Sequence, residues 1–130
     1  MEEGGVTELV AGMSPVELKE LNDLEDDLYN KWCPGKAARA LPLLEKHYEV
    51  LEGELKRIEA RIPKDRHSDE YAAQRHLADH AEHIRYDLEL TQLRRARYEA
   101  GLKHGLMHPE VESIKARTAS HIQKWLGRRA

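Results

Sequence analysis

The segment LPLLEKHYEVLEGELKRIEARI, residues 41–62, has the spacing of a coiled-coil helix. Its apolar positions follow one another in alternating steps of three and four residues, which is the heptad pattern of a helix that packs along another helix. We call these positions the seam. They are Leu41, Leu44, Tyr48, Leu51, Leu55, Ile58 and Ile62. Charged residues fill most positions between them, so the apolar stripe is narrow and predicts a neighbouring helix.

The composition supports a helical protein. The chain has 130 residues, of which 35% are charged and 5% aromatic, and it contains no Phe. Aliphatic side chains must therefore build the core, as is usual in helical bundles. We predict an all-α fold with a single domain over residues 1–130. The single cysteine, Cys33, excludes an internal disulfide framework and suits a reducing compartment, so we expect a cytoplasmic protein. No apolar run reaches the length of a membrane-spanning helix, and we expect no membrane association.

Start and stop signals divide the chain into helices. Ser14-Pro15-Val16-Glu17 supplies a capping box before an N-terminal helix predicted over residues 15–32. Residues 1–13 form a candidate docking arm. The apolar positions of this helix are Leu18, Leu21, Leu24 or Glu25, Leu28 and Trp32. Pro42 leaves two alternatives open: the seam helix begins near Leu41, or it is kinked there.

A second long helix follows the seam helix. Pro63 ends the first, Ser68 caps a helix predicted over residues 69–103, and Pro109 begins a C-terminal helix over residues 109–126. The short connection predicts an antiparallel hairpin of residues 41–62 and 69–103. The fold is therefore expected to be a four-helix arrangement built on a long, coiled-coil-like helical hairpin.

The second arm of the hairpin has two apolar faces, and the ends of the chain carry opposite charge. Residues 1–30 contain nine acids and one lysine, whereas residues 91–130 contain nine bases and three acids. Complementary charges of this kind orient association between copies or within a chain. We therefore predict an interface with a protein partner and with further copies of the chain. Its residues are Leu44, Tyr48, Leu51, Leu55, Ile58, Tyr86, Leu90, Leu93, Arg94, Arg97 and Trp125.

A histidine stripe is the one constellation with possible chemistry. His76, His80, His83 and Asp87 recur at helical spacing and fall within a stripe one side chain wide. A pair of histidines four residues apart can chelate zinc or nickel, and Asp87 can complete or orient the site. If the hairpin turns at residues 65–66, His47 lies level with His83 or Ile84 as a further ligand. The alternatives are the polar edge of a coiled coil and a pH-sensitive interface.

The sequence contains no nucleophile elbow, no phosphate-binding glycine loop and no readable pair of catalytic carboxylates, so we predict that the protein is not an enzyme. No cofactor is predicted beyond the zinc or nickel of the histidine stripe. Nucleic-acid binding through the basic residues 94–103 and the C-terminal region is an alternative, but the net charge of −3 does not favour it. The predicted function is non-enzymatic: self-association, and docking on a larger protein partner as an adaptor, accessory or virion-assembly subunit.

Overall fold

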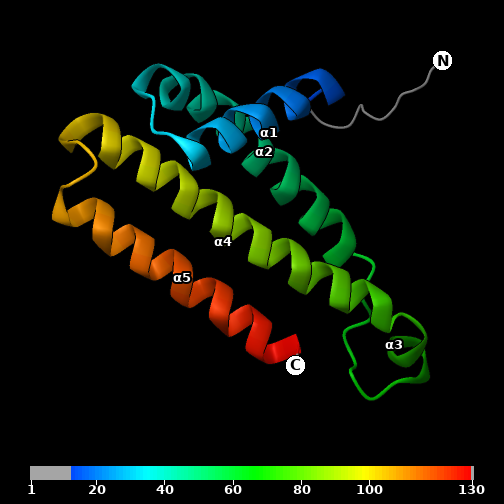
Figure 1. Cartoon of the computed structure of the whole chain (residues 1–130). Coiled ribbons are helices and arrows are strands. Elements are labelled where there is room, and N and C mark those ends of the chain that lie inside the picture. The colour runs from blue at the N-terminus through cyan, green and yellow to red at the C-terminus, as the bar shows by residue number, and fades with distance from the viewer. Residues whose placement is uncertain (1–12, 130) are drawn as a thin grey trace.

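The computed structural model describes residues 13–129, which form helices joined by turns and loops. The helices are α1 (Pro15–Asn30), α2 (Pro34–Glu59), α3 (Asp69–Ala73), α4 (Arg75–His104) and α5 (Pro109–Arg129). The predicted all-α fold is thus confirmed (Figure 1). The docking arm falls outside the described residues except for Met13, which packs against the core between α1 and α2.

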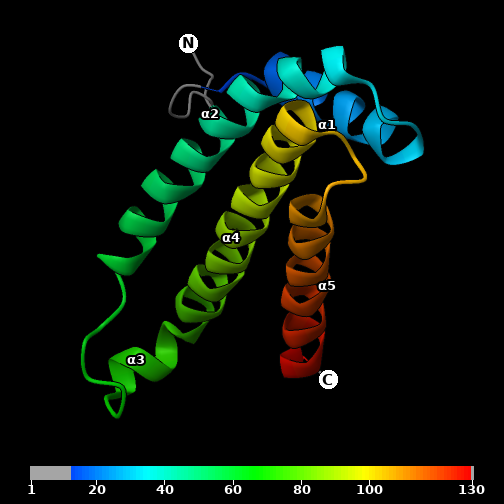
Figure 2. The same ribbon diagram turned by 90° about the vertical axis from the view of Figure 1, so that its left-hand side faces the viewer.

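A helical hairpin forms the centre of the fold. α2 and α4 run antiparallel and pack along each other, as the sequence predicts. Figure 2 shows α4 between α2 on one side and α5 on the other, with α5 antiparallel to α4. α1 crosses the end of the hairpin where α2 begins and α4 ends. α4 is therefore the central helix, with α2 and α5 on two of its sides and α1 near its C-terminal end.

The start of α1 follows the predicted capping box. The Ser14 hydroxyl accepts a hydrogen bond from the Glu17 backbone N–H at 3.1 Å, and Glu17 Oε1 accepts one from the Ser14 N–H at 3.0 Å. These bonds pair backbone donors that have no partner within the helix. The helix ends at Asn30, two residues before the predicted end, and Trp32 lies in the turn that leads to α2.

Of the two alternatives for the first arm of the hairpin, a start near Leu41 is wrong, because the helix runs through Pro42. α2 begins at Pro34 and continues through Pro42 to Glu59. Ala37 and Ala40, both 0% exposed, pack in the core beneath α1, and this burial favours helix in the turns before the proline. Figure 1 shows α2 changing direction between its first turns and its long C-terminal part, as expected where a proline interrupts the hydrogen-bond ladder.

The second arm of the hairpin is shorter than the predicted 69–103. Ser68 caps a helix as expected, because its side chain accepts a hydrogen bond from the Tyr71 N–H. That helix is only α3, which ends at Ala73 with Gln74 (φ −106°, ψ 18°) as its C-cap, and the long helix of the arm is α4. Residues 60–74 therefore serve as the connection between the two arms.

The long connection changes the register of the hairpin. Gln92 Nε2 donates to the Tyr48 hydroxyl oxygen at 3.1 Å, and Arg95 lies 3.6 Å from Glu45. These pairs place the centre of the hairpin near residue 70, so the register based on a turn at residues 65–66 is wrong. His47 lies near the level of Leu93 rather than His83. The physical reason is that α3 and its flanking turns extend the connection beyond a tight turn.

Among residues 13–129, the buried apolar side chains form three clusters along the hairpin. The first joins α1, the start of α2 and Tyr98 of α4. The second joins the seam residues Leu51 and Ile58 to the first half of α4, and the third joins the last part of α4 to α5. The seam thus finds its predicted helical partner within the same chain, in α4.

Candidate functional site

A groove opens between α1 and α5, with α4 as its floor. Figure 2 shows α1 and the start of α5 on the same side of α4. We call this feature the α1–α5 groove; its volume is about 740 Å³. It is lined by Asn22, Glu25, Asp26, Leu28, Tyr29, Leu90, Arg94, Arg97, Tyr98, Lys115, Thr118 and Ile122. Because α1 packs on α2 and α5 packs on α4, the face of α4 between them stays uncovered.

The two sides of the groove carry opposite charges. Glu25 and Asp26 come from α1, whereas Arg94 and Arg97 come from α4 and Lys115 comes from α5. One contact crosses the groove floor, where Glu25 Oε2 lies 3.5 Å from Arg94 Nε. The remaining acids of α1 face α2 or stay within α1; Glu17, for example, accepts a hydrogen bond from Lys46. The acidic side of the groove is therefore built by the face of α1 that points away from α2.

Two buried polar atoms in the groove make no hydrogen bond. Glu25 Oε2 and Arg97 Nε are both buried, and neither has a hydrogen-bond partner among the described residues. The Glu25 side chain is only 17% exposed, and burial raises the pKa of its carboxyl group; Arg94 opposes this rise and Asp26 adds to it. A buried polar atom without a partner typically costs about 1–3 kcal/mol.

Tyr98 is a buried residue of the groove floor. Its side chain is 6% exposed, and its ring centroid lies 6.3 Å from that of Trp32, with the two planes inclined at 46°. Burial, helped by the nearby charge of Glu25, raises the pKa of Tyr98 to about 12. The phenol is therefore uncharged at neutral pH and over a wider range of alkaline pH than an exposed tyrosine. In contrast, Tyr29 stands at the rim and is 88% exposed.

An aromatic cluster joins α4 to α5 beside the groove. The Tyr86 ring stacks on His121 at 4.7 Å and on Trp125 at 4.6 Å between centroids. His121 Nε2 donates to the Tyr86 carbonyl oxygen at 3.1 Å. Trp125 is 8% exposed, so most of its surface is used within the chain. Tyr86 and Trp125, which we predicted at an interface, thus hold two helices of the same chain together.

The other predicted interface residues divide between the core and the groove. Leu44, Leu51 and Ile58 are buried in the core clusters, Leu93 is also buried, and Tyr48 and Leu55 are half-buried against the hairpin. These residues meet other parts of their own chain. Leu90, Arg94 and Arg97 instead line the α1–α5 groove. The second apolar face predicted for the hairpin arm is therefore covered in part by α5 and in part left open as the groove floor.

The histidine stripe is only partly brought together. His76 and His80 are exposed on α4. His83 packs edge-on against Trp125 at 5.4 Å between centroids, and its Nε2 lies 3.5 Å from Asp87 Oδ2. Among the described residues, the group of three mutually close ligand atoms lies at the α4–α5 turn and not on this stripe. Metal binding by the stripe stays a prediction.

Acidic side chains lie close to several of the basic residues in the stretch 94–103. Arg95 lies 3.6 Å from Glu45 and 3.9 Å from Glu99, while Arg94 faces Glu25 in the groove. Paired arginines present less charge to a phosphate backbone than a continuous basic patch does. Nucleic-acid binding stays an untested alternative.

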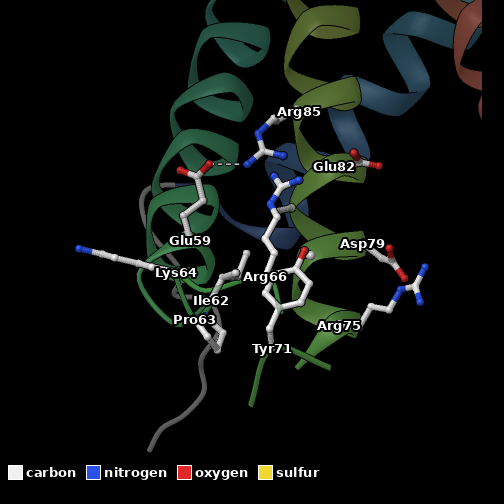
Figure 3. Close-up of a pocket in the computed structure, with 12 residues that line it drawn as sticks. Glu59, Ile62, Pro63, Lys64, Arg66, Tyr71, Arg75, Asp79, Glu82 and Arg85 are labelled. Atoms are coloured by element: carbon white, nitrogen blue, oxygen red, sulfur yellow. Dashed lines mark hydrogen bonds and ion pairs between the residues drawn. The ribbon is translucent and has the colours of Figure 1, made fainter. Parts of the chain in front are cut away.

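A second cavity, of about 520 Å³, lies where α2, α3 and α4 meet at the other end of the hairpin. Figure 3 shows the Arg66 and Arg85 side chains extending into it beside Tyr71, with Arg85 donating to Glu59. Its walls mix acids and bases. No buried side-chain polar atom of its described lining lacks a hydrogen-bond partner, in contrast to the α1–α5 groove. We therefore take the groove as the candidate functional site.

Sequence reasoning missed several groove residues, among them Tyr29, Tyr98 and Lys115. Glu25 gave a partial signal, because it shares an apolar position of the N-terminal helix with Leu24. An acid at the border of an apolar stripe indicates a side chain that is partly buried. Which helices would surround it depends on how α1 crosses the hairpin, and helical periodicity carries no information on that crossing.

Comparisons with protein-family models, with curated proteins and with solved structures found no match to this chain. Within residues 13–129, none of the helices combines the length and the apolar character needed to cross a lipid bilayer.

Proposed function

We propose that this chain is a non-enzymatic protein that self-associates, with the α1–α5 groove as the surface through which two copies pair. The observation that carries the proposal is the distribution of charge in the groove, where Glu25 and Asp26 stand on the α1 side and Lys115 stands on the α5 side. A second surface with the complementary charges can pair with such a groove.

Charge complementarity selects a second copy as the occupant. In a two-fold symmetric dimer, each surface patch meets the same patch of the partner. A groove with an acidic side and a basic side is complementary to itself in this arrangement, because Asp26 of one copy meets the Lys115 region of the other. Two-fold symmetry makes this contact occur twice in the dimer.

Tyr29 provides an apolar anchor for this pairing. It is 88% exposed at the groove rim and comes from the same helix as the acidic side. Tyrosine and arginine are enriched among the residues that dominate binding energy in protein interfaces. In the paired state, Tyr29 of one copy would cover the apolar part of the partner's groove, which Leu90 and Ile122 line. Docking on a larger protein partner, as an adaptor, accessory or virion-assembly subunit, is the wider role that we propose for the assembled form.

Charge reversal tests the proposal directly. Lys115→Glu makes the Asp26–Lys115 contact a pair of two acids and Asp26→Lys makes it a pair of two bases, so each variant alone should pair more weakly than the natural chain. An exposed charge contact contributes roughly 0.2–1 kcal/mol, and symmetry counts each contact twice. We expect the dimer dissociation constant, measured by sedimentation equilibrium, to rise about tenfold in either variant. An equimolar mixture of the two variants should recover pairing, because every contact is again between opposite charges.

Lys64→Glu is the matched control, since it makes the same charge change on an exposed residue at the opposite end of the hairpin. It should leave the dissociation constant unchanged. A natural chain that stays monomeric at several hundred micromolar would overturn the proposal. So would dimers that Lys115→Glu and Lys64→Glu weaken equally.

A further inference from the structure

The turn between α4 and α5 brings three potential metal ligands together. His104 ends α4, His108 precedes α5, and Glu110 lies in the first turn of α5. One ligand atom from each residue lies within 4.8 Å of the other two. We propose that these three residues bind a divalent transition-metal ion of the zinc class. This site is independent of the α1–α5 groove and of the histidine stripe on α4.

The distances fit the size of such an ion. His104 Nε2 lies 3.4 Å from Glu110 Oε1. Zinc–nitrogen and zinc–oxygen bonds of about 2.0–2.2 Å at a tetrahedral angle place two ligand atoms roughly 3.3–3.5 Å apart. The separation of these two atoms is therefore already that of one edge of a zinc tetrahedron. Two imidazoles and one carboxylate are also a ligand set that zinc uses, with water in the fourth position.

The backbone of the turn holds the three residues in place. Gly105 has φ +86°, a conformation that favours glycine, and its N–H donates to the Gly101 carbonyl oxygen at 2.9 Å. The two histidine rings stack with centroids 4.0 Å apart and planes inclined at 17°. Pro109 begins α5 at a fixed φ, which sets the direction of the following helix. The site therefore depends on the fold of the turn as well as on the spacing of the residues along a helix.

One hydrogen bond must be exchanged when the ion binds. The Glu110 backbone N–H donates to His108 Nδ1 at 3.1 Å, so in this arrangement the imidazole proton is on Nε2. An ion bound at Nδ1 replaces the N–H donor directly. An ion bound at Nε2 requires the proton to move to Nδ1, which also removes the bond. Either mode of binding therefore costs the hydrogen bond between the Glu110 N–H and His108 Nδ1.

Zinc titration of the full chain by calorimetry at pH 7.5 tests the site. We expect one zinc ion per chain, and a dissociation constant raised at least tenfold by His104→Ala, by His108→Ala and, to a smaller extent, by Glu110→Gln. All three side chains are exposed or half-exposed, and circular dichroism verifies that the variants stay helical. Zinc should also raise the thermal midpoint of the natural chain and not that of His108→Ala.

The double variant His76→Ala/His80→Ala is the matched control, because it removes two histidines from the stripe on the same helix. It should bind zinc like the natural chain. Uptake that is lost in this double variant and retained in His108→Ala would overturn the proposal and move the metal to the stripe. Half an equivalent per chain would also overturn it, because the ion would then be shared between two copies. Absence of binding by the natural chain would do the same. None of these results depends on whether the α1–α5 groove mediates pairing.

Discussion

Gly101 of α4 lies directly against the indole ring of Trp32. A Cβ atom added to Gly101 would stand 2.8 Å from Trp32 Cη2 and 3.0 Å from Cζ2, distances too short for an ordinary contact. The residue lies in the last turn of α4, within the helix, where glycine is a poorer helix former than alanine. Its value here is the close approach that it allows between α4 and the turn after α1.

Gly101→Ala should therefore destabilise the protein even though alanine is the better helix former. We expect the overlap with Trp32 to lower the free energy of unfolding by about 1–3 kcal/mol, which exceeds the gain of up to about 1 kcal/mol in helix propensity. Gly53→Ala is the matched control in the interior of α2, because its new Cβ would meet only Arg57 Nη1 at 3.6 Å. That variant should raise the free energy of unfolding by about 0.5–1 kcal/mol. Urea denaturation measures both, and equal effects would contradict the packing argument.

Trp125 should carry most of the stability of the α4–α5 contact. Trp125→Ala removes a side chain that is 8% exposed and stacks on Tyr86, so we expect a loss of about 3–5 kcal/mol in the free energy of unfolding. The adjacent Leu126 is 55% exposed, and Leu126→Ala should change the same quantity by less than about 0.5 kcal/mol. Chemical denaturation followed by circular dichroism distinguishes the two. A small effect of Trp125→Ala would mean that the stack contributes little.

His47 should make the protein less stable at mildly acidic pH. Burial lowers the pKa of His47 below its usual 6.5; Asp87 opposes this shift and Arg94 adds to it. In the window between the lowered pKa and 6.5, the unfolded chain takes up a proton that the folded chain does not. The contribution of His47 to stability is therefore complete above pH 6.5 and is lost as the pH falls below it.

His47→Gln should remove that part of the pH dependence. We expect the free energy of unfolding of this variant to fall less between pH 7.5 and pH 5.5 than that of the natural chain, measured by urea denaturation at each pH. His67→Gln changes an exposed loop histidine and should keep the natural profile. Identical profiles for His47→Gln and the natural chain would show that another group causes the acid sensitivity.

The capping box of α1 should have a measurable effect on its own. Ser14→Ala removes the acceptor for the Glu17 N–H, and loss of such a cap typically costs about 1 kcal/mol. Ser120→Ala makes the same chemical change at an exposed position within α5, where alanine is the better helix former. The first variant should lower the thermal midpoint and the second should not. If both variants behave alike, the cap does not stabilise α1 in the folded protein.

The helical character of the chain and the starts of α1 and α5 followed from local sequence. Ser14 caps α1 as predicted, whereas Ser68 caps only the short α3 and not the long second arm. The heptad spacing of Leu51 and Ile58 correctly indicated a helix that packs on another helix. These features depend on residues within one or two turns of each other, which periodicity and capping rules describe well. Local rules did not decide where the helix that contains Pro42 begins. The start at Pro34 depends on the burial of Ala37 and Ala40 under α1, which is a tertiary contact.

The arrangement of the sites required the tertiary structure. The register of the hairpin depends on the conformation of residues 60–74, and the α1–α5 groove depends on the angle at which α1 crosses the hairpin. His104 and His108 approach each other through a turn with Gly105 at positive φ, so the i, i+4 rule for a continuous helix did not apply to them. Local sequence sets which segments are helical because hydrogen bonding and side-chain periodicity act over a few residues. Packing between distant segments decides which side chains meet, because crossing angles and loop conformations depend on the whole core.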